Sequence, residues 1–199
     1  MKRKNKRTGN IIIAVGVVLV AIAFVWGGYN IVCEKIAESS SKEAMSEMEL
    51  DVIETNPDEI PDYILDSDMP MPIKVIKGRE YIGAVSIPAL DIDLPVLSQW
   101  SYENFRVAPC RYKGSAYKNN LILCAHNYRS HFASLKYLTQ GDRVYFTDMD
   151  KNKFAYEVAG VEVLDRTAVQ ELESGEWDLT LFTCTYGGAT RVVVRCNAV

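Results

Sequence analysis

The feature that most constrains this chain is a charge-free apolar run near its N-terminus. The run IIIAVGVVLVAIAFVWGGYNIV extends from Ile11 to Val32 without a charged residue. A helix of this length rises by about 1.5 Å per residue and spans the roughly 30 Å of hydrocarbon in a bilayer. The run therefore predicts a helix that crosses a membrane, with lipid as its partner.

The charges on either side of the run predict its orientation. Five basic residues precede it, and no acidic residue comes before Glu34. By the positive-inside rule, the N-terminus lies in the cytoplasm and the chain from Cys33 onward lies outside. We therefore expect a cytoplasmic basic segment over residues 1–10 and a single-pass transmembrane signal anchor over residues 11–32, in the cell membrane.

A cleaved signal peptide is the competing interpretation of the same run. Ala21–Ala23 has the small residues of a cleavage site after a short apolar core. The apolar residues continue well past that site, which favours a retained anchor. Both interpretations export the rest of the chain.

The exported part of the chain is acidic. The whole chain has 22 Lys and Arg against 26 Asp and Glu, and removing the five basic residues at the N-terminus leaves a net charge of −9. A domain of that sign repels phosphate backbones, so we expect no nucleic-acid partner.

The segment directly after the apolar run has the composition of a linker. Residues 34–72 contain twelve acidic residues and four prolines against two lysines. Such a segment buries little apolar surface and repels itself. We expect an acidic stalk over residues 33–72, with a marginal helix from Ser41 to Ile53; an acidic segment that folds over a site is the alternative.

From Ile73 the pattern changes to short β-branched and aromatic runs separated by turn residues, which is typical of an antiparallel β protein. The predicted strands are Tyr81–Ile87, Leu94–Leu97, Leu121–Ala125, Arg143–Thr147, Phe154–Leu164, Thr180–Cys184 and Arg191–Cys196. Because closure removes exposed sheet edges, a small closed β-barrel is the simplest architecture for them. We expect this mostly-β domain over residues 73–199, with a short helical turn at His131–Leu138.

Five cysteines lie at positions 33, 110, 124, 184 and 196, and an odd number leaves at least one unpaired in a monomer. Cys124 and Cys196 lie in apolar strand contexts, where a buried thiol acts as a small hydrophobe. A disulfide among Cys110, Cys124 and Cys196 remains open. The chain has no CxxC pair and no His/Cys cluster with metal-ligand spacing, so we expect no metal and no cofactor.

Cys184 differs from the other cysteines in its position. It ends a predicted strand, the glycine-rich segment TYGGAT follows, and Arg191 opens the next strand. Facing residues of such a hairpin approach to about 5 Å, so Arg191 can hold a positive charge near the sulfur. Arg195 is four residues further along an extended strand, roughly 13 Å away.

A nucleophilic thiol also benefits from a group that accepts its proton, because a thiol with an ordinary pKa is only a few per cent ionised at neutral pH. His126 ends the apolar run LILCAH and precedes a loop, whereas His131 opens the predicted helical turn. Composition and spacing alone leave open whether Cys184 is a packed thiol or the nucleophile of a Cys-His-Arg arrangement.

Five segments, in order, resemble those of sortases, the membrane-anchored cysteine transpeptidases of Gram-positive surfaces. They are IGAVSIPALDIDLPVL (Ile82–Leu97), LILCAHN (Leu121–Asn127), HFASLKYLTQGDRVYF (His131–Phe146), TLFTC (Thr180–Cys184) and TRVVVRC (Thr190–Cys196). The HN and TRVVV segments resemble class B members, while HFASL and the short connection from Asp165 to Asp178 resemble class D or E members.

The resemblance implies an eight-stranded sortase-type barrel and a role for each candidate residue. Cys184 would be the nucleophile, His126 the acid/base residue and Arg191 the group that positions substrate and stabilises the oxyanion. Thr183 would be a substrate or oxyanion contact, and His131 would not be catalytic.

The implied partners are surface proteins with a C-terminal LPxTG-like sorting signal, and an amine acceptor from a cell-wall precursor or a pilin lysine. Two other functions compete with this one. An exported cysteine peptidase would use the same residues and deliver the acyl group to water. A membrane-tethered β-barrel binding module would keep Cys184 merely packed.

Overall fold

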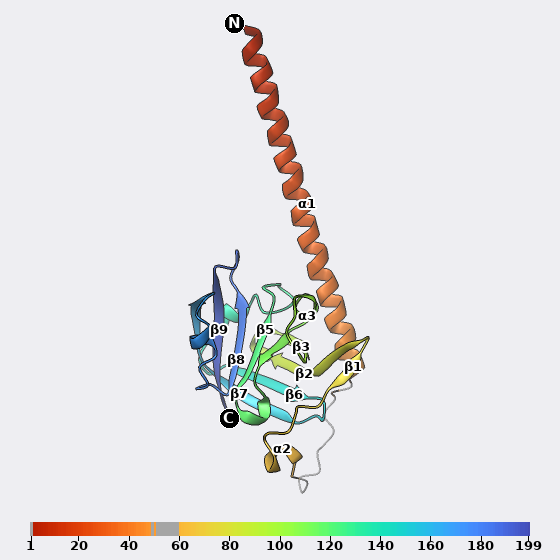
Figure 1. The fold of residues 1–199 in the computed structure, drawn as a ribbon, viewed down its shortest axis with the longest axis vertical. Coiled ribbons are helices and arrows are strands. Elements are labelled where there is room, and N and C mark those ends of the chain that lie inside the picture. The colour runs from red at the N-terminus through yellow and green to blue at the C-terminus, as the bar shows by residue number, and fades with distance from the viewer. Residues whose placement is uncertain (1, 49, 51–59) are drawn as a thin grey trace. The chain divides into compact units, whose positions relative to one another are not determined.

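The structure is a computed structural model, and it describes residues 2–48, 50 and 60–199 (Figure 1). The chain divides into two compact units, Met1–Ile36 and Ala37–Val199. The second unit contains all of the strands that the structure describes.

The first unit belongs to the helix α1, which runs from Lys2 to Met48. No proline interrupts this sequence, so its backbone hydrogen-bond ladder is continuous. From Ile11 to Val32 every residue is exposed, which leaves apolar side chains on all sides of the helix. The part from Thr8 to Met48 is long and apolar enough to cross a membrane, with a mean hydropathy of 2.7 in its most apolar window.

The second unit is built on one continuous sheet. Its strands are β1 (Lys74–Ile76), β2 (Arg79–Ile87), β3 (Ile92–Leu97), β4 (Cys110–Lys113), β5 (Leu121–Ala125), β6 (Arg143–Asp148), β7 (Lys153–Asp165), β8 (Leu179–Cys184) and β9 (Thr190–Ala198). They follow the spatial order β1-β2-β3-β4-β5-β8-β9-β7-β6, and β6 pairs back with β2. The strands β2 to β9 therefore close into an eight-stranded barrel, which confirms the expected fold, while β1 adds a short hairpin partner to β2.

Short helices and turns connect the strands (Figure 1). They are α2 (Asp62–Leu65), α3 (Tyr102–Phe105), α4 (Val169–Leu172) and the 3-10 turns η1 (Pro88–Leu90), η2 (Ala116–Lys118) and η3 (Leu135–Tyr137). The turn η3 falls inside the predicted helical turn at His131–Leu138. All seven predicted strands are present, and the prediction missed β1 and β4.

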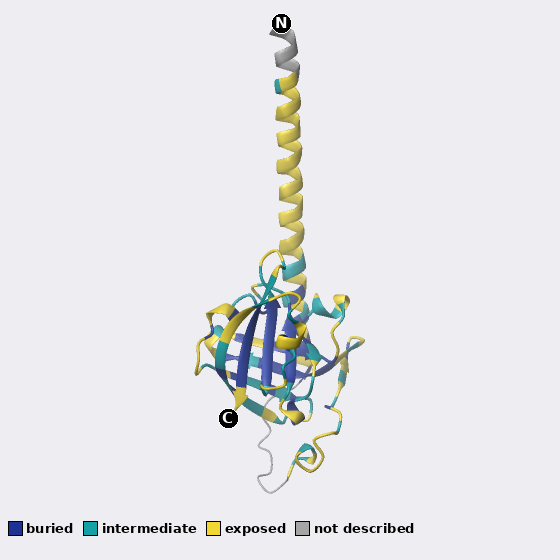
Figure 2. Ribbon diagram, turned by 60° about the vertical axis from the view of Figure 1, so that its left-hand side comes forward, coloured by how far each residue is buried: buried dark blue, intermediate teal, exposed yellow. Residues whose placement is uncertain are grey.

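The central strands are buried on both faces, as Figure 2 shows for the dark strands of the barrel. Along β5 and β8, alternate residues point into the barrel, where Leu121, Leu123, Leu179 and Leu181 belong to the main core. The residues between them point outward, as expected from the period of two in a strand. These outward residues form a second apolar cluster that includes Ile122, Cys124, Phe182, Val193 and the α4 residue Leu172.

The C-terminal end of α1 packs against the outside of the barrel. Ala44 and Met48 are 4% and 2% exposed and belong to the second apolar cluster. Ser41 Oγ donates to the carbonyl of Val107 at 3.0 Å, and Lys77 forms an ion pair with Glu43. Part of the segment for which the composition predicts a stalk is therefore a helix docked on the barrel.

This helix also covers most of the described part of the predicted marginal helix. The prediction runs from Ser41 to Ile53, and α1 continues through Ser41 as far as Met48. Residues 49 and 51–53 of that prediction lie outside the described residues.

Candidate active site

Cys184 and Arg191 face each other across the β8–β9 hairpin. Cys184 is the last residue of β8, and the register pairs it directly with Arg191 of β9. The turn between them is held by Thr185, whose amide donates to the carbonyl of Thr190 at 2.9 Å and whose hydroxyl lies 2.8 Å from that of Thr190. The hairpin expected from the sequence is thus confirmed.

Two glycines allow the backbone conformation that this turn requires. Gly187 and Gly188 have φ values of +87° and +72°, a region that other residues enter only with strain. Tyr186, between Thr185 and these glycines, is fully exposed at the tip of the turn. The sequence TYGGAT therefore fixes the register that brings the thiol and the guanidinium together.

His126 is the first residue after β5, on the strand that flanks β8 on its other side. The strands β5 and β8 run parallel, and Ala125 pairs with Thr183. The next residue along each strand, His126 and Cys184 respectively, therefore lies at the same end of the sheet. The structure thereby brings the three candidate residues to one end of three adjacent strands.

The structure places the side chain of Thr183 against the end of β5. Thr183 is 2% exposed, and its hydroxyl donates to the carbonyl of Ala125 at 2.8 Å. This bond ties the end of β8 to the residue before His126. The side chain of Thr183 thus helps to hold the end of β8, and with it Cys184, beside the end of β5.

The guanidinium of Arg191 retains unused hydrogen-bonding capacity. Its Nη1 atom is buried and has no hydrogen-bond partner among the described residues. Its Cζ atom lies 5.5 Å from the centre of the Phe182 ring, an arrangement in which the ring face attracts the cation. A buried donor without a partner costs free energy, so this nitrogen is well placed to donate a hydrogen bond to an oxygen of a bound molecule.

Two aromatic rings contact the imidazole of His126, which is half-buried. The centre of its imidazole lies 4.1 Å from that of Phe105 and 4.6 Å from that of Tyr128. Burial, together with the positive charge of Arg106, lowers the pKa of His126 to about 4. At neutral pH the imidazole is therefore uncharged and can accept a proton.

The remaining thiols of the second unit lack the exposure of Cys184. Cys184 is half-buried, whereas Cys110, Cys124 and Cys196 are at most 1% exposed. Burial raises the pKa of Cys110 and of Cys196 to about 12, and it also raises the pKa of Cys124. All five cysteines of the chain carry free thiols in the structure, and Cys110 faces Cys124 across β4 and β5.

Arg195 has a structural role instead of a place beside the thiol. Its guanidinium donates to the carbonyls of Leu172 and Glu171 at 2.9 and 2.6 Å, and to the hydroxyl of Thr180 at 3.1 Å. Its Nε also donates to Glu162 at 2.8 Å. These bonds fasten α4 to the outward face of β8 and β9.

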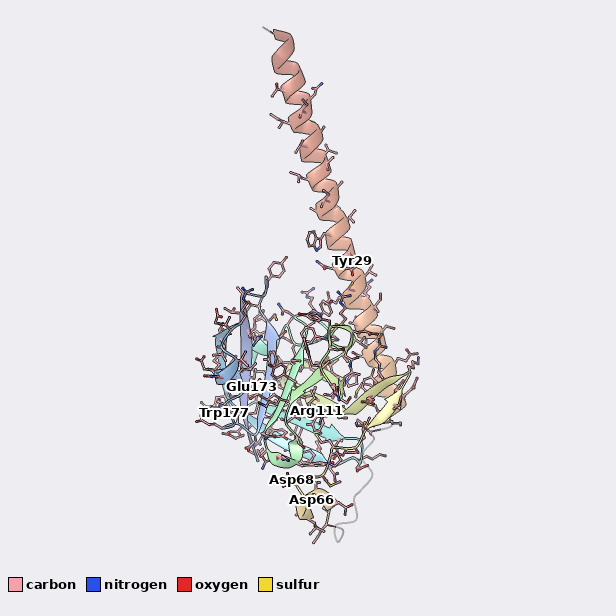
Figure 3. The ribbon with its side chains drawn as sticks, in the orientation of Figure 1. Tyr29, Asp66, Asp68, Arg111, Glu173 and Trp177 are labelled. Atoms are coloured by element: carbon pink, nitrogen blue, oxygen red, sulfur yellow. The ribbon has the colours of Figure 1, made fainter. Side chains whose placement is uncertain are left out.

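A cavity of about 420 Å³ lies on the same outward face of β8 as Cys184. It includes Thr180, which is four residues before Cys184 and so roughly 13 Å from it along the strand. Arg111, Glu173 and Trp177, labelled in Figure 3, also line it. The outward face therefore offers a thiol at one end and a mixed polar and aromatic cavity further along.

Within the described residues, no group of three or more His, Cys, Asp or Glu side chains has the arrangement of a metal site. A half-buried thiol, a neutral imidazole and a cation with a free donor are the parts required for acyl transfer through a thioester.

Sequence reasoning missed the aromatic residues around His126. Tyr128 is only two residues away and could have been suspected, whereas Phe105 reaches His126 from α3. The local signals for α3 are the N-cap residue Ser101, whose hydroxyl accepts from the amide of Asn104, and Glu103 in the first turn.

Comparisons with known proteins agree with this geometry. A model of the sortase domain matches residues 85–199, more than half of the chain. A curated relative, sortase A of Bacillus anthracis, is 31% identical over 113 residues, which are 53% of each chain. The chain thus spans about half the length of that relative.

Solved structures of class C sortases are also similar. Sortase C1 from Streptococcus suis is 27% identical, with a TM-score of 0.53 over 60% of this chain and 73% of that one. Sortase C-1 from Streptococcus pneumoniae is 27% identical, with a TM-score of 0.54 over 63% of this chain and 69% of that one. These matches include class A and class C members, so they support the family and neither of the subclass resemblances. By its domain, its barrel and its match to these relatives, the chain belongs to the sortase family.

Proposed function

We propose that this protein is a membrane-anchored cysteine transpeptidase that cleaves an LPxTG-like sorting signal and transfers the protein to an amine of the cell wall or of a pilin. The observation that carries the proposal is the pairing of Cys184 with Arg191, beside His126 at the end of the adjacent strand. Membership of the sortase family supports it.

The first half of the reaction makes a thioester. Neutral His126 takes the proton of the Cys184 thiol as the sulfur attacks the backbone carbonyl of the sorting signal. Arg191 stabilises the negative charge that develops on the carbonyl oxygen. When the C–N bond breaks, His126 returns the proton to the departing amine, and the acyl group remains on Cys184.

The second half regenerates the enzyme. The acceptor amine loses a proton to His126 and attacks the thioester carbonyl. The C–S bond breaks, and the thiolate of Cys184 recovers its proton from His126. One amide is exchanged for another, so no oxidation or reduction takes place.

The cavity along β8 supports an extended peptide substrate. Four residues of an extended chain cover roughly 13 Å, which equals the separation of Thr180 from Cys184. We propose that a residue several positions from the scissile bond enters the cavity beside Trp177 and Arg111.

We further propose the four-part organisation of the chain: a cytoplasmic segment (1–10), an anchor (11–32), an acidic linker (33–72) and an extracellular catalytic domain (73–199). The exposed apolar surface of α1 supports the anchor. The helix docked from Ala37 to Met48 supports a linker whose first part, up to Met48, is held against the barrel.

The full chain in detergent, incubated with an LPxTG peptide and a set of amines, tests the proposed activity by mass spectrometry of the products. We expect an amide between the peptide and an amine. Cys184→Ala and His126→Ala should abolish turnover, and Arg191→Lys should reduce it at least about tenfold, because a point charge does not reproduce guanidinium geometry.

Arg166→Lys is the matched control, because Arg166 is exposed near the same turn and should tolerate the change. Wild-type rates from Cys184→Ala would exclude the mechanism. Free acid alone, with every amine offered, would identify a peptidase instead.

A further inference from the structure

The imidazole of His126 lies between two aromatic rings that come from different elements. The Tyr128 ring is nearly parallel to it, at an interplanar angle of 20°, and the Phe105 ring is inclined at 44°. Tyr128 belongs to the same loop as His126. Phe105 is the last residue of α3, so its contact depends on where the barrel holds that helix.

The segment that carries Phe105 is firmly held. The amide of Phe105 donates to the carbonyl of Ser101 at 2.8 Å, and the side chain of Asn104 donates to the carbonyl of Gln99 at 3.0 Å. Beyond the helix, the carbonyl of Val107 accepts the bond from Ser41 of the docked end of α1. The ring of Phe105 is thus fixed from two sides before any substrate binds.

The same segment places a positive charge near the imidazole. Arg106 follows Phe105 directly, and its charge opposes protonation of His126. The other titratable or charged groups around His126 are Tyr128 and His131 on its own loop, and Cys184 and Arg191 at the ends of β8 and β9. Burial is the larger cause of the lowered pKa of His126, and the positive charge of Arg106 is the second.

We propose that Phe105 and Arg106 are positioning residues that keep His126 uncharged and aligned with Cys184. Phe105 covers one face of the imidazole and excludes water from it. Arg106 adds an unfavourable interaction with an imidazolium ion. The proposal rests on the proposed function, because it assigns these two residues to the acid/base step.

The consequence for the reaction is a base that is ready at neutral pH. A neutral imidazole can take the proton of the thiol when the sulfur attacks. Once protonated, it lies near a cation and in a site that disfavours charge, so it gives the proton readily to the departing amine. A lower proton affinity weakens the imidazole as a base in the first step and strengthens it as an acid in the second, and Phe105 and Arg106 exert this effect without contacting the substrate.

A purely structural role for Phe105 would give a different result. In that case, removing the ring would lower stability and activity but would leave the pH dependence of His126 unchanged. The decisive readout is therefore the titration of the imidazole.

The chain has two histidines, so NMR of the histidine-labelled full chain in detergent gives two imidazole signals, and His126→Ala assigns them. We expect the midpoint of His126 near its lowered pKa of about 4 in the wild type. In Phe105→Ala the midpoint should rise toward the ordinary value of about 6.5. Arg106→Gln should raise it too, and because Arg106 is exposed this variant should fold even if Phe105→Ala does not.

Tyr102→Ala is the matched control, because Tyr102 is an 80% exposed aromatic residue of the same helix whose ring contacts Trp100 and not His126. Its midpoint should equal that of the wild type. Phe105→Leu, which keeps apolar cover, should shift the midpoint less than Phe105→Ala. An unchanged midpoint in both Phe105→Ala and Arg106→Gln would overturn the proposal.

The pH profile of peptide cleavage provides the kinetic counterpart. The acid limb of kcat/KM should move to higher pH in Phe105→Ala and Arg106→Gln, and it should stay in place in Tyr102→Ala. Because the NMR titration needs no substrate, it distinguishes failure of this proposal from failure of the proposed transpeptidase activity.

Discussion

Cys184 differs from its neighbours in exposure more than in sequence context. Cys124 also lies in an apolar strand, on the same outward face, yet it is 1% exposed and the second apolar cluster covers it. A thiol reacts as the thiolate, and burial opposes its formation. The structure therefore separates one accessible sulfur from three inert ones in the second unit.

This separation predicts selective alkylation. In a Cys33→Ser background, which removes the thiol of α1, iodoacetamide at neutral pH should add one label per chain, at Cys184. Peptide mass spectrometry after digestion identifies the labelled residue, and unfolding in denaturant should expose Cys110, Cys124 and Cys196 as the positive control. Labelling of Cys124 at the rate of Cys184 in the folded protein would contradict this picture of the site, and an inert Cys184 would favour the binding-module alternative.

At the scale of elements, α4 depends on a single arginine. A helix of four residues has no stability of its own, and Arg195 supplies the bonds that hold its carbonyls. Leu172 of this helix belongs to the same outward cluster as Phe182, on the face that leads to Cys184. The position of α4 therefore shapes the surface beside the thiol.

Arg195→Met should remove these bonds while keeping most of the apolar stem. We expect the free energy of unfolding to fall by about 2 to 3 kcal/mol, because buried acceptors lose charged donors. Chemical denaturation measures this change, and hydrogen exchange should show faster exchange in α4. Arg166→Met, at an exposed position on the same connection, should change the free energy by no more than about 0.5 kcal/mol. Equal effects of the two substitutions would show that Arg195 does not hold α4 in place.

The elements with strong periodicity were predictable from the sequence. In β5 and β8 every residue is apolar or small and the runs are bounded by turn residues, so their ends agree with the structure to within one residue. The strand β4 escaped prediction because its sequence CRYK is polar and pairs with β5 through a bulge. Tertiary contacts, and not local pattern, make it a strand.

The docked end of α1 shows a signal that composition concealed. Ala37, Ser41, Ala44 and Met48 are all buried, and their spacing of four, three and four residues is that of one helix face. The acidic residues between them dominate the composition, which predicts a solvated linker instead of a packed helix. Within the site, the hairpin and the strand-end histidine followed from sequence, but the contact of Phe105 with His126 did not, because it depends on how α3 packs.

At the scale of the whole molecule, the half-buried His126 and the fully buried His131 make stability depend on pH. Burial lowers the pKa of both His126 and His131 to about 4 from an ordinary value of 6.5. Between these values the unfolded chain binds protons that the folded chain does not. Their contribution to stability is therefore fully present above pH 6.5 and is lost as the pH falls toward about 4.

Thermal unfolding of the full chain over this pH range should show a midpoint that falls steeply with acidification. His131→Phe should flatten the dependence, because it removes one of the two groups and keeps an aromatic ring in a fully buried position. Lys136→Gln, an exposed change on η3, should leave the slope as it is. A midpoint that is constant or rises on acidification would contradict the assigned protonation states.

The closed barrel also limits how a peptide can be recognised. The strand that ends in Cys184 is flanked on one side by β5 and on the other by β9, so it presents no unpaired main-chain edge. An incoming chain therefore cannot pair with β8 as an added strand and gain a ladder of backbone bonds there. Discrimination between peptides must then depend on which side chains fit the outward surface, and replacing backbone amides of the peptide by esters away from the cleaved bond should matter far less than changing one residue.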